Sequence, residues 1–427
     1  MIVLSLPFIS TEFISAEISR NQTDFYEFRL DTYNGDLSSE LVTSKTILTD
    51  RKRGVAPYID IALQTGCMLD CENLETIPRN LPDKQLILSH HWYDDSWNSD
   101  DLHNFIDHGN TSRAGILKLA VYVSSYNQLK PILTALRGAS KPVIFAGMGP
   151  LGKFSRIFFY SVYGYGTYTA LPELPTATGQ LSLKELALFN LPGSDTPAIG
   201  GLIGGEQVWD SLGINHFNNL FRQQKLAAVY LPFNVSDKEN FLNWLDDFRD
   251  NLYGFSLTMP HKRLFTHKAN LAFPEDNGWT LQNTDAIAFE KAAAELNLSP
   301  ADRILIYGSG AVAETAIEVF SEKYKVSITG RNKATVKHLA KKFGLPTPFK
   351  NCNVIINCTP SGLLPLSLSL TSIEKVIDLP YGKKPTMLTI WCQHHGIPCI
   401  NGREFWYFQA QEQEKQFLRE IQLHQGG

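Results

Sequence analysis

Lys118 and His91 are the first pair of side chains in this 427-residue chain whose types and spacing could do chemistry. Lys118 stands in the apolar run Ile116–Val121, where burial would disfavour the ammonium form and favour a neutral, nucleophilic amine. Such an amine can form a Schiff base with a ketone, and the iminium makes the neighbouring proton removable. A histidine can take that proton and return it to a leaving hydroxyl group. His91 precedes Lys118 by about one strand–helix unit, which predicts that the two lie on adjacent strands.

Other polar side chains in the first half could hold an anionic substrate that is rich in hydroxyl groups. Arg156 follows another apolar run and suits a bidentate grip on a carboxylate. The candidates for the hydroxyl groups are Arg29, Arg51, Thr176 and Gln180. Glu27, two residues before Arg29, belongs either to the same site or to a buried structural ion pair with that arginine.

A second lysine predicts a different reaction. Lys262 ends the segment GFSLTMPHK (Gly254–Lys262), and Asp285 ends the segment QNTD downstream. Reduction of a ketone needs a group that protonates the new alkoxide oxygen. Lys262 can donate that proton, and Asp285 can hold and polarise the lysine.

A nucleotide-binding pattern follows the apolar run Arg303–Tyr307. The next residues are GSGAVA, in which Gly308, Gly310, Ala311 and Ala313 belong to a G-x-G-x-x-A pattern between a predicted strand and a predicted helix. The first glycine permits a tight turn, and the second lets the backbone approach a pyrophosphate at the helix N-terminus.

The residues after the next predicted strand indicate which dinucleotide binds. A site for NAD usually places an acidic residue there, on the ribose hydroxyl. This chain has Arg331 and Lys333 instead, which suit a 2′-phosphate. The sequence therefore predicts NADP as the cofactor.

The elements that position these residues indicate an α/β fold. Short apolar runs alternate with amphipathic stretches in the first half, as in a (β/α)8 barrel with its site at the carboxyl ends of the strands. Between Arg51 and Tyr58 there is too little chain for a crossover helix, so one connection is expected to be shortened. The eight expected strands are Ile2–Leu6, Phe25–Arg29, Thr46–Thr49, Tyr58–Ile61, Gln85–Ser89, Ile116–Val121, Val143–Ala146 and Tyr165–Ala170.

Changes in pattern along the chain predict several domains. The segment NLPGSDTP is rich in turn-forming residues and reads as a linker. A second α/β region begins after it, and a third begins near the G-x-G turn. The expected parts are a barrel over 1–190, a linker over 191–197, a second lobe over 198–288, a Rossmann domain over 289–401 and a C-terminal helix over 402–427.

Composition narrows the class of protein. The formal net charge is −4, and nucleic-acid-binding surfaces usually show a basic excess, so no nucleic-acid partner is expected. No apolar run reaches membrane-spanning length, and MIVLSLPFIS lacks the basic start and cleavage site of a signal peptide. The six cysteines match no metal or disulfide spacing, which predicts free thiols, no metal and a cytoplasmic location.

The motifs of the first half, taken in order, resemble type I 3-dehydroquinate dehydratases over about residues 2–189. They are EFR with Glu27, TDR with Arg51, SHH with His91, GILKLA with Lys118, the segment Met148–Arg156 and TATGQ with Gln180. The resemblance implies dehydration of 3-dehydroquinate to 3-dehydroshikimate. It assigns Lys118 to the Schiff base and His91 to general acid and base catalysis.

The motifs of the second half resemble shikimate dehydrogenases over most of residues 200–425. They are GFSLTMPHK, QNTD, AVYLPFNV, NCTPSGL, DLPYGKKPT and the segment from Gly402 to Gln409. The resemblance implies NADPH-dependent reduction of 3-dehydroshikimate to shikimate and a two-lobed unit with a C-terminal helix that returns to the substrate lobe. It makes Lys262 and Asp285 the catalytic pair, and the residues it places around shikimate are Thr258, Asn270, Tyr381 and Gln409.

The chain departs from both families. The dehydratases carry an orienting glutamate in Glu-Gly-Gly shortly after the residue that Arg51 matches, and no acid follows Arg51 here. The dehydrogenases hold the substrate carboxylate with two serines, and those positions are Asp210 and Leu212. Two alternatives therefore stay open: a dehydrogenase with a barrel that has lost its activity, and a non-enzymatic module that senses NADP. Oligomeric state, channelling and preference between quinate and shikimate are left open.

Overall fold

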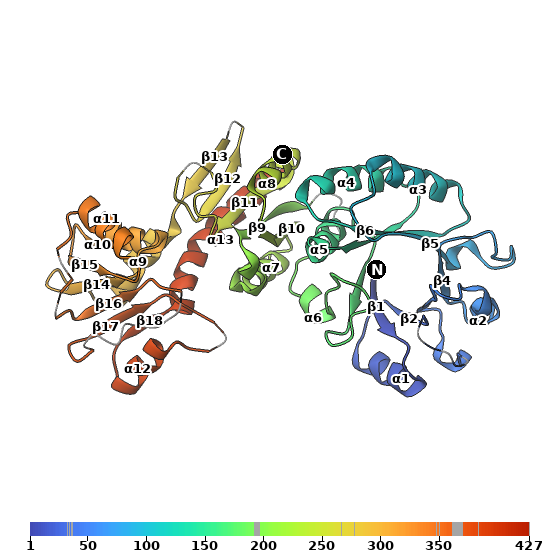
Figure 1. The fold of residues 1–427 in the computed structure, drawn as a ribbon, viewed down its shortest axis with the longest axis horizontal. Coiled ribbons are helices and arrows are strands. Elements are labelled where there is room, and N and C mark those ends of the chain that lie inside the picture. Colours follow the sequence, from blue (N-terminus) through green and yellow to red (C-terminus); the bar gives the residue numbers. More distant parts are fainter. Residues whose placement is uncertain are drawn as a thin grey trace. The chain divides into compact units, whose positions relative to one another are not determined.

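Eight parallel strands form a nearly closed ring in the first part of the chain (Figure 1). The strand order is β7-β6-β5-β4-β3-β2-β1-β8, and a single bridge between Ile144 and Gly166 closes the ring. The predicted barrel is confirmed. Its strands are β1 (Ile2–Pro7), β2 (Phe25–Arg29), β3 (Thr46–Thr49), β4 (Met68–Cys71), β5 (Leu86–Trp92), β6 (Ile116–Tyr122), β7 (Val143–Met148) and β8 (Thr167–Ala170).

The computed structural model describes residues 1–31, 33, 35, 37–191, 197–265, 267–276, 278–346, 348–349, 351–360, 370–382 and 384–426. Most of the expected linker, 192–196, lies outside these residues. The chain divides into two units, Met1–Leu252 and Tyr253–Gly427. No helix in the described part of the chain is long and apolar enough to cross a membrane.

One expected strand is wrong. Tyr58–Ile61 lies in a helical segment, and Tyr58 and Ala62, one helical turn apart, are the buried residues. The expected shortening between β3 and β4 is wrong for the same reason, because that connection carries α2 (Ile59–Thr65). The true fourth strand, β4, has Asp70 in its buried interior, and this charge interrupts the apolar pattern that would have marked a strand.

Two of the other barrel connections hold only short turns among the described residues, and the rest carry α-helices. Only a 3-10 turn, Asp83–Gln85, precedes β5 in the connection from β4. Within the described residues, the connection from β2 to β3 likewise holds only the 3-10 turn Ser39–Leu41. The helices of the barrel are α1 (Thr11–Arg20), α2, α3 (Ser99–Thr111), α4 (Leu129–Arg137), α5 (Gly152–Val162) and α6 (Leu183–Leu186).

Apolar side chains fill the lower part of the barrel. A buried cluster that includes Val3, Ile47, Ile87 and Ile144 closes its amino-terminal end. Small residues lie toward the other end, where Ala120 and Ala146 pack with Met148. Small side chains leave space at the carboxyl ends of the strands, where barrel sites are built.

The first unit continues beyond the barrel with two parallel strands that pair over seven residues each, β9 (Ala198–Gly204) and β10 (Ala228–Asn234). An aromatic core joins them to the barrel: Tyr126 lies against Phe154 on α5 and against Trp244 on α8. The hydroxyl of Tyr126 also donates to the backbone oxygen of Asn234 at 3.2 Å. The helices of this part are α7 (Leu212–Gln223) and α8 (Lys238–Asp247).

The second unit contains an antiparallel group, β11 (Leu252–Leu257), β12 (Leu271–Glu275) and β13 (Gly278–Gln282), and a five-stranded parallel sheet. The sheet order β15-β14-β16-β17-β18 places the G-x-G turn after a central strand, which confirms the expected Rossmann-like fold. Its elements are β14 (Arg303–Tyr307), α10 (Ala311–Phe320), β15 (Lys325–Thr329), α11 (Lys333–Lys342), β16 (Val354–Asn357), β17 (Lys375–Asp378), α12 (Met387–His395) and β18 (Cys399–Asn401). Helices α9 (Thr284–Glu295) and α13 (Gly402–Gly426) pack against each other.

Candidate active sites

A cavity of about 260 Å³ opens at the carboxyl ends of the barrel strands. Every barrel residue that the sequence put forward lines it, although they come from strands, loops and a helix that are far apart in the chain. These residues are Glu27, Arg29, Arg51, His91, Lys118, Arg156, Thr176 and Gln180. The structure adds Tyr93, Met148 and Tyr168 to the lining.

Lys118 is buried at 6% exposure, but its surroundings are not apolar as the sequence suggested. Its Nζ lies 2.6 Å from Asp70 Oδ2 and 3.4 Å from Glu27 Oε1, and 4.1 Å from the centre of the Tyr168 ring. Two carboxylates and an aromatic face stabilise a cation at this nitrogen. The expectation of an apolar pocket around Lys118 is therefore wrong.

Asp70 was missed by the sequence reasoning because its strand was placed elsewhere. Burial alone would raise the pKa of Asp70, but the cations Arg51 and Lys118 hold it well below its usual range. Arg51 Nη2 lies 2.7 Å from Asp70 Oδ1. Asp70 is thus a fixed negative charge that links the lysine to a neighbouring arginine.

Arg156 is a buried cation without an ion pair among the described residues. It is 2% exposed, and its Nε donates to the backbone oxygen of Gly147 at 2.8 Å. Desolvation lowers its pKa to about 10, with Glu27 opposing the shift. A buried guanidinium that lines a cavity and lacks a carboxylate partner suits an anionic ligand.

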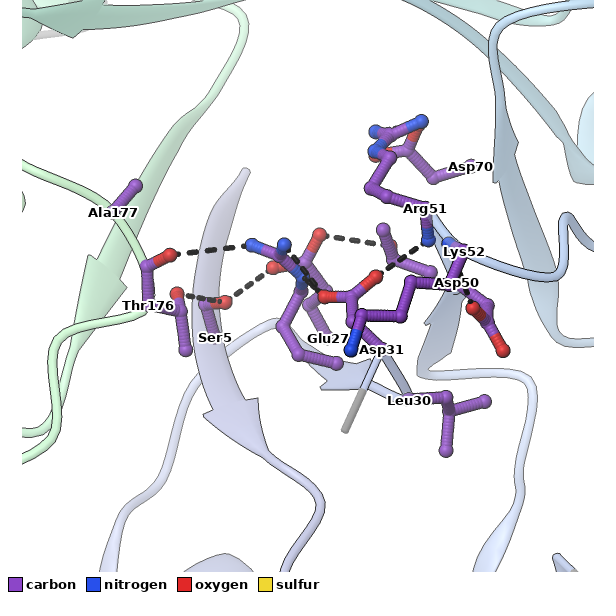
Figure 2. A network of polar contacts seen from close by, with 12 residues as sticks. Ser5, Glu27, Leu30, Asp31, Asp50, Arg51, Lys52, Asp70, Thr176 and Ala177 are labelled. Carbon is purple, nitrogen blue, oxygen red and sulfur yellow. Dashed lines mark hydrogen bonds and ion pairs between the residues drawn. The ribbon is translucent and has the colours of Figure 1, made fainter. Parts of the chain in front are cut away.

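Figure 2 shows a polar network that joins strands β1 and β2 to the loop that carries Thr176. Ser5 bridges Glu27 and Thr176: it donates to the carboxylate and lies 2.6 Å from the threonine hydroxyl. Arg29 pairs with Asp31 at 2.7 Å, and its Nη1 reaches the backbone oxygen of Thr176 at 3.4 Å. These bonds tie the loop that carries Thr176 to the barrel rim.

Gln180 holds the same loop by its side-chain oxygen. Oε1 accepts from the backbone nitrogen of Thr176 at 2.8 Å and from that of Ala177 at 2.9 Å. Glu27, fully buried, accepts from Thr49 at 2.8 Å as well as from Lys118. Glu27 lines the cavity, as the first alternative has it, and its ion-pair partner is Lys118. Arg29, its partner in the second alternative, pairs with Asp31 instead.

His91 meets an acid that the sequence reasoning did not find. Its Nδ1 lies 3.0 Å from Oε1 of Glu72, the residue directly after β4. Burial lowers the pKa of His91, and Lys118 and Arg51 lower it further, while the bond to Glu72 opposes them. His91 is therefore the neutral imidazole at pH 7, as a general base requires. The expectation that no acid meets this histidine is wrong.

The second lysine, Lys262, lies in the turn after β11 and forms a buried ion pair with Asp285 at the start of α9. Asp285 Oδ1 also accepts from Asn270 Nδ2 at 3.1 Å and from Gln409 Nε2. Thus four of the predicted residues meet at one carboxylate, although α13 brings Gln409 from the far end of the chain.

Two other predicted residues of this site are less closely tied to it. Thr258 begins the turn, and its backbone oxygen accepts from His261 N at 2.7 Å. Tyr381 is 45% exposed and lines a cavity of about 160 Å³ with Gly402 and Arg403. In the first unit, Asp210 is exposed at the end of a 3-10 turn, and Ser211 caps α7.

The G-x-G turn fits a dinucleotide. Gly308 has φ +135, and a Cβ there would lie 3.0 Å from the backbone oxygen of Cys358. Gly310 is the N-cap of α10 without a side-chain cap, and a Cβ there would meet open space. Ala311 begins the helix and Ala313 is fully buried in the core beneath it. The first N–H groups of α10 are thus left for an anion.

Arg331 and Lys333 are exposed beyond the carboxyl end of β15. Asn332, between them, caps α11 through a bond from Thr335 N at 3.1 Å. The residues between β15 and α11 include no acid, so no carboxylate stands there to repel a 2′-phosphate.

Comparison with known proteins matches each half to a family. Residues 45–189 match the model of type I 3-dehydroquinase, and residues 203–272 match the model of the shikimate dehydrogenase substrate binding domain. The chain therefore carries a type I 3-dehydroquinase domain followed by a shikimate dehydrogenase domain. Its first half is thus a dehydroquinase barrel and its second half a shikimate dehydrogenase, as the motifs predicted, which makes the chain a lyase and an oxidoreductase of the shikimate pathway.

Curated relatives match the dehydrogenase half. A shikimate dehydrogenase (NADP(+)) of Prochlorococcus marinus is 29% identical over 230 residues, which are 43% of this chain and 79% of that protein. One of Clostridium botulinum is 29% identical over 244 residues, 49% of this chain and 92% of that protein. These relatives support the prediction of NADP as the cofactor of the dehydrogenase half.

Solved structures align with low overall similarity. Shikimate dehydrogenase from Aquifex aeolicus aligns with 55% of this chain and 94% of its own, at 24% identity and a TM-score of 0.45. The dehydroquinate dehydratase and shikimate dehydrogenase of S. pombe AroM align with 99% of this chain and 95% of their own, at 18% identity and a TM-score of 0.38.

Proposed function

We propose that the barrel dehydrates 3-dehydroquinate through a Schiff base at Lys118, and that the second half reduces the resulting 3-dehydroshikimate to shikimate with NADPH. The observation that carries the first step is one cavity that brings together Lys118, His91 and Arg156, a cation without an ion pair among the described residues. The second step is supported by the Lys262–Asp285 pair and by an open G-x-G turn in the same unit.

The charges around Lys118 suit the intermediate. The Lys118 ammonium first gives up one proton, and the neutral Nζ then attacks the ketone carbon to form a carbinolamine. Return of that proton to the carbinolamine hydroxyl releases one water and leaves an iminium, so the charge at the nitrogen is again positive. Asp70 and Glu27, which face the ammonium at 2.6 Å and 3.4 Å, then face that iminium. The carboxylates therefore stabilise the species that withdraws electrons from the adjacent carbon.

His91 takes the proton from that adjacent carbon, and the electron pair moves toward the iminium nitrogen. The C–O bond to the hydroxyl then breaks, and His91 returns the proton so that the hydroxyl leaves as water. Hydrolysis of the iminium frees Lys118. Arg156 binds the substrate carboxylate, and Arg29, Arg51, Thr176 and Gln180 hold hydroxyl groups.

In the second half, the G-x-G turn would hold NADPH, and the bound cofactor would supply the hydride. Gly308, Gly310, Ala311 and Ala313 form the turn for the pyrophosphate, and Arg331 and Lys333 bind the 2′-phosphate. Lys262 Nζ delivers a proton to the new alkoxide oxygen, and Asp285 keeps that lysine oriented. Thr258, Asn270, Tyr381 and Gln409 line the shikimate site.

The working division of the chain is a barrel over 1–190, a substrate lobe over 198–288, a cofactor domain over 289–401 and a returning helix over 402–427. One ground for an inactive barrel, the missing connection, has gone, because α2 is present. The other ground, the missing acid, is weakened by the bond between Glu72 and His91.

The test is a dehydratase assay that follows enone absorbance from 3-dehydroquinate, beside Lys118→Ala. A rise in absorbance that the variant lacks supports the proposal, as does a borohydride-reduced adduct on Lys118. If the intact protein oxidises shikimate with NADP⁺ yet gives neither enone nor adduct, the barrel is inactive and only the second half is an enzyme.

A further inference from the structure

Glu72 contacts two residues of the candidate barrel site, His91 and Arg51. It follows β4 directly, its side chain is about half exposed, and both residues that it contacts line the cavity. Oε1 contacts His91 Nδ1 at 3.0 Å and Arg51 Nη1 at 3.7 Å. Arg51 in turn pairs with Asp70, so one arginine holds both carboxylates at this strand end.

The bond to Glu72 determines which histidine nitrogen is basic. A carboxylate only accepts hydrogen bonds when ionised, so Nδ1 of His91 carries the hydrogen and donates it to Glu72. The hydrogen bond from His91 holds the pKa of Glu72 below its usual range, which keeps it ionised. Nε2 is left without a hydrogen and is the nitrogen that can accept a proton.

We propose that Glu72 is the positioning residue for His91: it fixes the ring and its tautomer, and it stabilises the imidazolium that forms when His91 accepts a proton. It takes over the task of the carboxylate that the dehydratase pattern would place after Arg51, but from the next strand of the barrel. This inference rests on the proposed dehydratase function of the barrel.

Charged groups from several elements shift the pKa of His91, and they do not all shift it in the same direction. The direction of the shift therefore helps to identify the effect of Glu72. Lys118 on β6 and Arg51 after β3 favour neutral imidazole, while Asp70 on β4 and Glu72 favour the imidazolium. The ring of Tyr93 stacks on His91 at 5.7 Å. Loss of Glu72 alone therefore lowers the pKa of His91 and moves the acid limb of the rate profile to lower pH.

The experiment compares Glu72→Gln, Glu72→Asp and Glu75→Gln in the full chain. Glu75 is an exposed acid three residues further along the same loop and serves as the matched control. We expect Glu72→Gln to lower kcat for dehydration about 10-fold or more, because a misoriented base loses most of its advantage. We expect Glu72→Asp to recover part of the rate, and Glu75→Gln to match the unsubstituted protein.

Further measurements on Glu72→Gln distinguish a positioning role of Glu72 from a merely structural one. Borohydride trapping at Lys118 and reduction by the second half should both survive Glu72→Gln, while the acid limb shifts to lower pH. If the acid limb of Glu72→Gln does not shift and its dehydration rate stays within about twofold of the unsubstituted protein, the proposed role of Glu72 is wrong. The proposed function of the barrel would still stand. No dehydration and no trapping in the unsubstituted protein would overturn the barrel function as well.

Discussion

The two halves of this chain each bury a lysine against an aspartate, and the two pairs are built differently. Lys118 projects from the middle of a barrel strand and meets Asp70 and Glu27 together. Lys262 lies in a turn and meets Asp285 alone, while Asn270 and Gln409 occupy the other oxygen of that carboxylate. One lysine faces two charges, whereas the other shares one charge with neutral donors.

The difference matches the chemistry assigned to each lysine. A Schiff-base lysine carries a positive charge as the resting ammonium and again as the iminium, so additional negative charge stabilises both of these states. A proton donor must lose its charge in the reaction, and a second carboxylate would oppose that loss. The scaffold differs as well, because the covalent lysine stands on a strand and the proton donor stands in a turn, and sites on strands are held more precisely than sites on loops.

The largest expected effects come from removing each lysine. Lys118→Ala should lower dehydration roughly 10⁴-fold or more and leave reduction within about twofold, because only the covalent route is lost. Lys262→Ala should lower reduction about 10²–10⁴-fold and spare dehydration. Separate assays of the two reactions on each variant measure this, and a variant that impairs both reactions equally would contradict two independent sites.

Asp70→Asn should destabilise the protein more than Asp285→Asn. The first change leaves two cations, Lys118 and Arg51, beside a neutral amide in the barrel interior, and breaking such a buried pair costs about 3–5 kcal/mol. The second leaves one cation, Lys262, beside the neutral amide. Urea unfolding of both variants, with fluorescence followed at each transition, compares the two losses, and equal losses would remove the distinction between the pairs.

The Asp70 pair should also depend on pH. The pKa of Asp70 is held well below its usual range by Arg51 and Lys118 against the effect of burial. A carboxyl group with a depressed pKa contributes stability that is fully present above its unfolded pKa of about 3.9 and is lost as the pH falls through its folded pKa. The stability difference between Asp70→Asn and the unsubstituted protein should therefore be constant from pH 7 to 5 and shrink below about pH 4. A difference that persists at lower pH would assign the loss to packing.

The sequence predicted both lysines and most of their partners but not the acids at the end of β4. Gln409 could be predicted because its motif is linear, although its contact with Asp285 spans the chain. Asp70 and Glu72 could not, because a charge inside a strand breaks the alternation by which strands are recognised. Tyr58–Ile61 has a more strand-like apolar pattern, so the sequence predicts the fourth strand there and not at β4. The error concealed the acid that meets His91.

The smallest expected effect concerns how the two lysines are held. The residues after Lys262 are tied to α10 by ion pairs: Arg263 and Lys268 both meet Glu314, at 3.0 Å and 3.8 Å. Arg263 is 62% exposed in its side chain, and exposed pairs contribute at most about 1 kcal/mol and weaken with salt. Glu314→Gln should therefore raise KM for NADPH or lower kcat for reduction by only about 2–5-fold, within that limit.

In the unsubstituted protein, reduction should weaken more than dehydration as salt rises, since Lys118 is held by a strand and buried charges. Parallel salt titrations of both reactions measure this, with Glu318→Gln, which removes only the pair to Lys268 at 2.9 Å, as the control. An equal response of the two reactions would show that the turn is held by packing, as the strand is.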